Sequence, residues 1–126
     1  MNVLMQAQNA YSANTQNHIR SPRAVEYAAV ARVTSRLKKA GSEGPDHFPE
    51  LAAALNENRD LWRMLAMDVA SDGNGLPTGL RARLFYLFEF TDQHTTKVLE
   101  RSADISPLVE INTAIMRGLS DSGAQG

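Results

Sequence analysis

The sequence predicts an all-α fold: a small bundle of about five helices with a central antiparallel hairpin at about residues 46–70 and 77–101. Apolar residues recur at steps of three and four, which places them on one face of a helix. Ser-Pro pairs at positions 21–22 and 106–107 are typical helix starts. No segment shows the sustained alternation of apolar and polar residues that is typical of a β-strand.

The first predicted helix is short and lies close to the N-terminus. Its apolar residues share one helical face, and a polar run at residues 12–17 ends it. A helix of this length is marginal in water by itself, so we expect it to dock on the rest of the domain or on a partner. The residues of its apolar face are Val3, Leu4, Ala7 and Tyr11.

The second predicted helix begins at Ser21-Pro22, with Ser21 as N-cap, and runs to about Ala40. Residues 41–45 read Gly-Ser-Glu-Gly-Pro, a composition typical of a linker. We expect this linker to be mobile and to vary in length. The inward positions of the helix are Tyr27, Val30, Val33 (or Thr34) and Leu37.

The predicted hairpin turns at residues 71–75, Ser-Asp-Gly-Asn-Gly, since glycines reach positive φ at little cost. We expect Trp62 to be buried against the helix that follows the turn. Pro77 suits the first turn of that helix. Its residues 80–90 are apolar almost all round, which is typical of a helix buried in the middle of a domain. The inward stripe before the turn consists of Leu51, Leu55, Trp62, Leu65 and Val69.

The last predicted helix starts at Ser106-Pro107 and ends near Leu119. Residues 1–119 then form one helical domain, in keeping with a chain of 126 residues. The polar residues 120–126 are expected to be a disordered tail. The inward residues of this helix are Leu108, Ile111, Ile115 and Leu119.

The composition excludes several classes of function. The chain contains no cysteine, which rules out disulfides, thiolate metal sites and cysteine nucleophiles. Its first residues lack the basic start and apolar core of a secretory signal. The longest strongly apolar run, residues 84–88, is far shorter than the ~20 residues that cross a bilayer. We therefore expect a cytoplasmic protein without membrane insertion.

The sequence offers no catalytic or metal-binding constellation. Asp68, Asp72, Gly73 and Asn74 match part of a calcium-binding loop, but two of its oxygen ligands are missing. The three histidines lie in separate segments without the spacing of a zinc site. We expect no enzyme activity, no cofactor and no bound metal.

Polar residues inside the helices are expected to have partners. Asn58 and Asn112 interrupt apolar stripes. Each is expected to bond the backbone of a neighbouring helix or to cap the turn, since buried amides are paired; a bond to a partner's backbone is the alternative. Arg81 lies in the early turns of a helix, where the dipole disfavours cations, so we expect a carboxylate partner from Asp68 or Asp72.

Basic residues are concentrated in the first 40 residues, which carry six Lys or Arg residues and one acidic residue. A solvated helix face that pairs with acidic neighbours is the first interpretation, and an RNA contact is the alternative. No aromatic residues interleave with the cluster for base stacking, and the pI of about 6.3 is low for a nucleic-acid-binding domain. Nucleic acid is therefore the weaker interpretation. The basic cluster consists of Arg32, Arg36, Lys38 and Lys39.

A set of short motifs runs in order through the chain from about Tyr11 to Leu119. The motifs are Pro22-Arg23-x-x-Glu26, Asn58-x-x-Leu61-Trp62, Asp68, Asn74-x-Leu76-Pro77, Leu80-Arg81 and Ile111-Asn112-x-x-Ile115-x-x-Gly118-Leu119. With these spacings the set resembles the FlaF family, the flagellar biosynthesis regulators and flagellin secretion chaperones of alphaproteobacteria.

The resemblance implies a small cytoplasmic protein that binds flagellin and promotes its synthesis and export, alongside a separate translational regulator. Other flagellar regulators or the export apparatus are further partners that the resemblance allows. Direct contact of the basic cluster with RNA, as a post-transcriptional regulator of flagellin expression, is the alternative function. The family offers no catalytic residues, and its motif residues are expected to determine the fold. Here they are Arg23, Glu26, Asn58, Trp62, Asn74, Leu76, Pro77, Arg81 and Asn112.

The apolar residues of the hairpin exceed what one small core can hold. Flagellin ends are long amphipathic segments that stay unfolded until assembly, and a helical bundle can hold such a segment in an apolar groove. The alternatives are that the outer helices cover these residues or that a second copy of the chain does. We expect flagellin to contact Met64, Met67, Phe85, Phe88 and Phe90, with the helix around Tyr11 as a movable cover.

Overall fold

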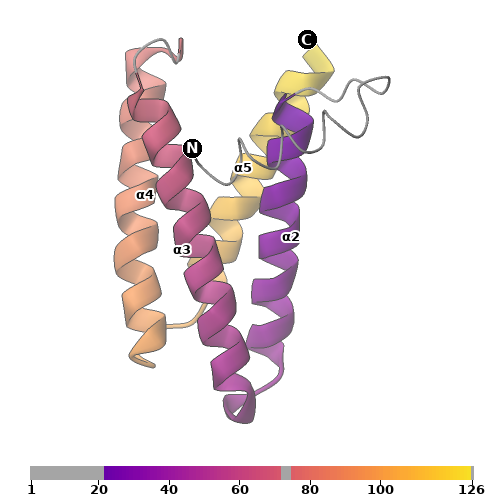
Figure 1. Ribbon diagram of the computed structural model, residues 1–126, viewed down its shortest axis with the longest axis vertical. Helices are drawn as coiled ribbons and strands as arrows, with labels where there is room; N and C mark the ends of the chain where they lie inside the picture. Colours follow the sequence, from indigo (N-terminus) through magenta and orange to yellow (C-terminus); the bar gives the residue numbers. More distant parts are fainter. Residues whose placement is uncertain (1–21, 72–74, 126) are drawn as a thin grey trace.

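The computed structural model describes residues 22–71 and 75–125, which form four α-helices and one short 3₁₀ helix (Figure 1). The prediction of an all-α bundle with an antiparallel helix hairpin is confirmed. The expected helix around Tyr11 and the turn residues 72–74 lie outside the described residues. The elements are α2 (Pro22–Ser42), η1 (Pro45–His47), α3 (Phe48–Ala70), α4 (Thr78–Leu99) and α5 (Ser106–Gln125).

The four long helices pack in the order α4, α3, α2, α5. Helix α3 packs against both α2 and α4, and α5 packs against α2. Helices α4 and α5 touch only slightly, so the bundle is not closed between them. In Figure 1, α3 and α4 form one pair and α2 and α5 form another, and the two pairs separate toward the upper end of the view.

One end of the bundle has a fully buried core, and we call it the closed end. It lies where α2 and α4 end and where α3 and α5 begin. Leu37, Leu55 and Leu108 are each 0% exposed there, and burying a leucine side chain contributes roughly 2–3 kcal/mol. The buried cluster consists of Leu37, Ala40, Ala54, Leu55, Val98 and Leu108.

The connection between α2 and α3 belongs to this closed end and is shorter than the sequence predicted. Helix α2 continues through Ser42, so the expected linker at residues 41–45 is wrong for its first two residues. A Cβ added at Gly41 would lie 2.6 Å from Ile105 Cδ1, so the glycine permits close packing of α2 against the loop before α5. Only Gly44 departs from ordinary backbone geometry here, with φ of 87°.

Helix α4 also ends at the closed end, two residues before the predicted boundary. Arg101 adopts φ of 63°, its N–H bonds the Val98 carbonyl, and the Ser102 N–H bonds the Lys97 carbonyl. This is the arrangement in which glycine usually ends a helix. The Arg101 guanidinium lies 4.3 Å from the centre of the Phe48 ring, and this cation–π contact offsets the unfavourable backbone geometry.

Helix α4 is an outer helix, and the prediction that it is buried in the middle of the domain is wrong. Its buried side chains are Thr91, Thr95 and Val98, all in the second half. The Thr95 hydroxyl donates to the Thr91 carbonyl at 2.6 Å, which satisfies this polar group inside the protein. No side chain between residues 80 and 90 is buried.

The outer ends of α4 and α5 differ slightly from the predicted boundaries. Pro77 precedes α4 at the N-cap position, and its carbonyl accepts the Arg81 N–H at 3.0 Å. Helix α5 runs to Gln125, past the domain end expected at Leu119. The disorder expected for residues 120–126 stays a prediction.

Candidate functional site

A buried polar network joins α2, α3 and α5 at the middle of the bundle. The Asn112 side-chain amide donates to Asn58 Oδ1 at 2.8 Å and to Thr34 Oγ1 at 3.0 Å. The Trp62 indole N–H donates to Asn112 Oδ1 at 2.9 Å. All four side chains are buried. The Asn58 Nδ2 atom has no hydrogen-bond partner, but the three bonds that centre on Asn112 form in one relative placement of the helices and so fix their register.

This network corrects two expectations. Asn58 and Asn112 bond each other and a threonine hydroxyl instead of the backbone groups expected for them. Trp62 is buried, as predicted, but its N–H points to α5 and not to α4. The physical reason is complementarity: an asparagine side chain offers both donors and an acceptor, so one residue can serve three neighbouring side chains.

A cavity of about 420 Å³ lies beside Trp62, between all four long helices. Its walls come from the first half of α2, the last turns of α3, Leu76 and the first turns of α4, and the middle of α5. We call this end of the bundle the open end, since it is opposite the closed end. The lining residues are Glu26, Val30, Trp62, Leu65, Ala66, Asp68, Val69, Leu76, Leu80, Leu84, Ala114, Ile115 and Gly118.

The cavity walls are mainly residues that the sequence analysis assigned to the core. Leu65 and Val69 continue the inward stripe of α3, and Leu84 belongs to the apolar residues 80–90, but the helices separate there and leave space between them. A volume of 420 Å³ falls in the range of about 300–1,000 Å³ typical of ligand pockets. An inward stripe therefore does not guarantee a filled core.

The residues expected to contact flagellin lie outside this cavity. Met64, Phe85, Phe88 and Phe90 are half-buried, Met67 is 66% exposed, and none of the five lines the cavity. Tyr11 lies outside the described residues. The structure thus has two apolar features at the open end, the cavity and the surface of the first half of α4.

We call the second feature the apolar half of α4, residues 80–90. Tyr86 is 67% exposed and Leu80 is 40% exposed, while the other large side chains are half-buried. Extended apolar surface of this kind marks interaction sites in soluble proteins. The apolar half of α4 consists of Leu80, Leu84, Phe85, Tyr86, Leu87, Phe88 and Phe90.

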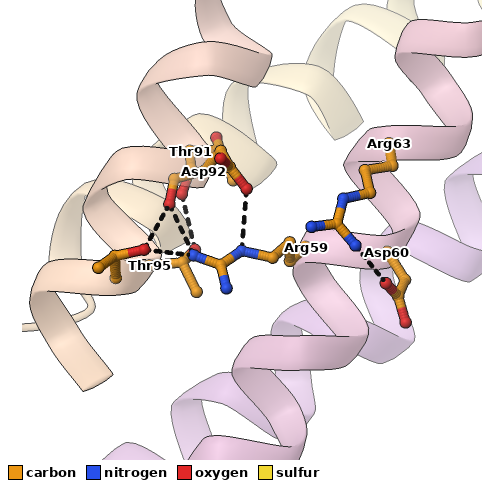
Figure 2. A network of polar contacts seen from close by, with 7 residues as sticks. Arg59, Asp60, Arg63, Thr91, Asp92 and Thr95 are labelled. Carbon is orange, nitrogen blue, oxygen red and sulfur yellow. Dashed lines mark hydrogen bonds and ion pairs between the residues drawn. The ribbon is translucent and has the colours of Figure 1, made fainter. Parts of the chain in front are cut away.

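Arg59 of α3 holds α4 in place just beyond this apolar half (Figure 2). Its Nε lies 3.0 Å from Asp92 Oδ1, and its Nη2 donates to the Asp92 carbonyl at 2.8 Å and to the Thr96 hydroxyl at 2.7 Å. The Arg59 side chain is 17% exposed. The neighbouring Arg63–Asp60 pair is exposed and bridges one turn of α3 alone, at 3.4 Å.

The sequence analysis missed Arg59 because a charged residue in a helix normally faces water. One signal could have identified it. Leu55, Arg59, Trp62 and Ala66 follow each other at steps of four, three and four, so Arg59 continues a buried stripe. A guanidinium on such a stripe needs acceptors from the next helix, and Asp92 supplies two of them.

Arg81 connects the two helices on the other side of the turn. Its Nε donates to the Val69 carbonyl at 3.1 Å, in the last turn of α3. The sequence analysis expected a carboxylate in this role, and of the two candidates Asp72 lies outside the described residues. A backbone carbonyl serves because the C-terminus of α3 carries the negative end of its dipole.

The basic cluster on α2 is paired with α3. Arg32 Nη1 lies 3.0 Å from Glu57 Oε1, and Arg36 bonds the other oxygen of the same carboxylate. Lys38 and Lys39 are exposed. The pairing supports the interpretation of a solvated helix face with an acidic neighbour.

Ionisable groups elsewhere act as structural ties. The Ser106 N–H donates to Asp104 Oδ1 at 2.8 Å, and hydrogen bonds from Ser106 lower the pKa of the exposed Asp104 carboxyl. The His94 ring stacks on Phe90 and bonds the Asp104 carbonyl at 2.7 Å.

The described residues contain no group of three or more His, Asp or Glu side chains placed to hold a metal ion. Within the same ranges, none of the helices combines the length and apolar character needed to cross a bilayer.

Comparison with known proteins identifies the family of the chain. Residues 7–119 match the family described as "Flagellar protein FlaF", and this match spans nearly the whole chain. No match was found among curated proteins or solved structures. The matched region includes α2, α3, α4, residues 106–119 of α5, the polar network around Asn112 and every residue that lines the cavity. The chain therefore belongs to the FlaF family of flagellar proteins.

Proposed function

We propose that this protein binds flagellin in the cytoplasm as a secretion chaperone and thereby promotes flagellin synthesis and export. The observation that carries the proposal is the apolar half of α4, where large apolar side chains follow one another and none is buried. Membership of a flagellar family makes a flagellar protein the natural partner.

The chemistry of the surface favours an amphipathic helix as ligand. Flagellin ends are amphipathic segments, and a helix of that kind can cover apolar side chains at steps of three and four. Phe85 and Phe88 are three residues apart on α4 and can serve as anchors, since large aromatic residues carry much of the energy of an interface. Met64 and Met67 on α3 are flexible and can adapt to several partner side chains.

The way α4 is held supports a binding role. The α3–α4 contacts beyond the apolar half include the Arg59 bonds to Asp92 and Thr96, which fix the second half of α4. The first half remains attached at the turn by the Arg81 bond to Val69. A helix secured at both ends presents its middle as a rigid surface, which lowers the entropy lost when a partner binds.

Calorimetry with purified flagellin tests the proposal. Phe85→Ala and Phe88→Ala should each weaken binding by roughly tenfold or more, since truncation of a central aromatic anchor typically costs about 2 kcal/mol. Circular dichroism must first establish that both variants are folded. Tyr27→Ala is the matched control, because Tyr27 is an aromatic residue of α2 outside the proposed surface and is 41% exposed. Wild-type affinity in both folded phenylalanine variants would place the flagellin site elsewhere.

A further inference from the structure

We propose that the cavity at the open end is the docking site of this chain's own N-terminal segment, residues 1–21. In this arrangement the apolar side chains of the segment would enter the cavity. The proposal concerns the cavity, which shares Leu80 and Leu84 with the apolar half of α4, and it does not rest on flagellin binding. The side chains that enter are Val3, Leu4, Ala7 and Tyr11.

The N-terminal segment joins α2 close to the cavity. Helix α2 begins at Pro22, and Glu26, one turn later, already lines the cavity. At 1.5 Å per residue, the start of α2 is about 6 Å along the helix axis from the cavity wall. Residues 12–21 could span up to about 33 Å when extended, so a helix at residues 3–11, about 13 Å long, can fold back into the cavity.

The second argument is charge. Glu26 and Asp68 are the charged residues among those that line the cavity. The first 21 residues contain no aspartate or glutamate, while Arg20, His18 and the α-amino group can carry positive charge. A segment without acidic groups can approach these two carboxylates without repulsion, and its basic groups are attracted to them.

The cavity and the N-terminal segment both have apolar surface that docking would bury. A cavity walled by leucine, valine, isoleucine and tryptophan side chains loses contacts as long as it stays empty. A nine-residue helix is marginal in water by itself and needs a surface on which to bury its apolar face. The family match begins at residue 7, so Ala7 and Tyr11 belong to the same matched unit as the cavity walls.

Paramagnetic relaxation measurements on the full chain test this docking. The chain has no cysteine, so Asn9→Cys provides a unique attachment point for a spin label. In the helix expected from the sequence, Asn9 is on the face opposite Val3, Ala7 and Tyr11, so a label there should leave the proposed contact intact. Glu100→Cys, on an exposed residue at the closed end, is the matched label for the control.

The expected result is strong broadening of methyl signals from Val69, Leu84 and Ile115 by the label at position 9. Signals from Leu55 and Leu108 at the closed end should stay sharp, and the label at position 100 should give the reverse pattern. Tyr11→Ser should reduce the broadening at the open end several-fold. Tyr27 is 41% exposed, so its predicted inward position is wrong, and Tyr27→Ser should leave the broadening unchanged.

Two outcomes would overturn the proposal. One is the absence of broadening at the open end with the label at position 9. The other comes from a control in which spin-labelled protein without isotopes is mixed with isotope-labelled protein without a spin label. If the broadening in this mixture is as strong as in the chain that carries both labels, the segment that occupies the cavity comes from a second copy. Flagellin is absent from both experiments, so their outcome is independent of the calorimetric test.

Discussion

The closed and open ends of this bundle use apolar residues in different ways. At the closed end, aliphatic residues of modest size are completely buried, with Leu37, Leu55 and Leu108 at 0% exposure. Toward the open end, larger residues of α4, including Phe85 and Phe88, remain half-buried and lie outside the cavity. The larger apolar side chains thus lie where they contribute less to the fold.

This difference teaches that stability and function are divided along the length of the molecule. The buried network of Trp62, Asn58, Asn112 and Thr34 separates the two ends and fixes the helices against each other. On one side of it lies a filled core, and on the other side a smaller buried cluster around Val30, Val33 and Leu61 borders the cavity. A separation of this kind lets a partner approach the open end without disturbing the core that holds the fold.

The largest effect is expected at the boundary between the ends. Trp62→Ala removes the largest fully buried side chain and leaves Asn112 without the indole donor, so it should destabilise the domain by about 3–5 kcal/mol and unfold much of it. Thermal unfolding followed by circular dichroism measures the change. Trp62→Phe keeps most of the ring and should cost less, about 1–3 kcal/mol. An unchanged melting temperature in the alanine variant would contradict the claim that the buried network fixes the helices between the two ends.

A matched pair of leucines compares the two ends directly. Leu55→Ala at the closed end should cost about 2–5 kcal/mol, because it leaves a cavity in a filled core. Leu84→Ala at the open end should cost about 1 kcal/mol or less, because its side chain is half-buried and already borders a cavity. Urea unfolding of both variants measures the difference. Equal losses would mean that the ends do not differ in their contribution to stability.

Arg59 should matter next, as the tie between α3 and the second half of α4. Arg59→Met removes three polar contacts to Asp92 and Thr96 from a side chain that is 17% exposed, at a cost of about 1–3 kcal/mol. Arg63→Met is the control: its exposed pairing with Asp60 should contribute about 0.5 kcal/mol or less. Chemical denaturation compares the two, and a smaller loss for Arg59→Met than for Arg63→Met would contradict the assigned role.

The basic cluster should have the smallest effect. Changing Arg32, Arg36, Lys38 and Lys39 to Gln removes two exposed pairings with Glu57, each contributing roughly 0–1 kcal/mol. Flagellin affinity should remain close to wild type, since the cluster is on α2 and the proposed site is on α3 and α4. Salt-sensitive binding to flagellin messenger RNA in a gel-shift assay, lost in this variant, would support an RNA-contacting regulator instead.

The sequence predicted the helices well because their signals are local. Steps of three and four, the Ser-Pro pairs and the glycine-rich turn located α3, α4 and the start of α5 within two residues. The positions of the helices in the bundle depend on contacts between distant residues, and here the prediction failed. Residues 80–90 appeared buried because composition does not distinguish a side chain covered by the core from one left for a partner.

Three individual residues show why part of the candidate site could not be predicted. Thr95 is buried although polar, because its hydroxyl bonds a carbonyl of its own helix. Arg59 is largely buried because Asp92, 33 positions away, provides acceptors. Gly41 resembles a linker residue, but its lack of a side chain leaves room for the end of the distant Ile105 side chain. Each case depends on a neighbour that the local sequence does not reveal.

Hydrogen exchange of the full chain, with and without flagellin, tests the division between the two ends most directly. Without flagellin, amides of residues 78–90 in α4 should exchange faster than amides of residues 50–58 at the closed end, which surround Leu55. Addition of flagellin should slow exchange in residues 78–90 and leave residues 50–58 unchanged. Protection confined to residues 50–58, or no protection anywhere, would contradict the claim that the open end of the bundle binds the partner.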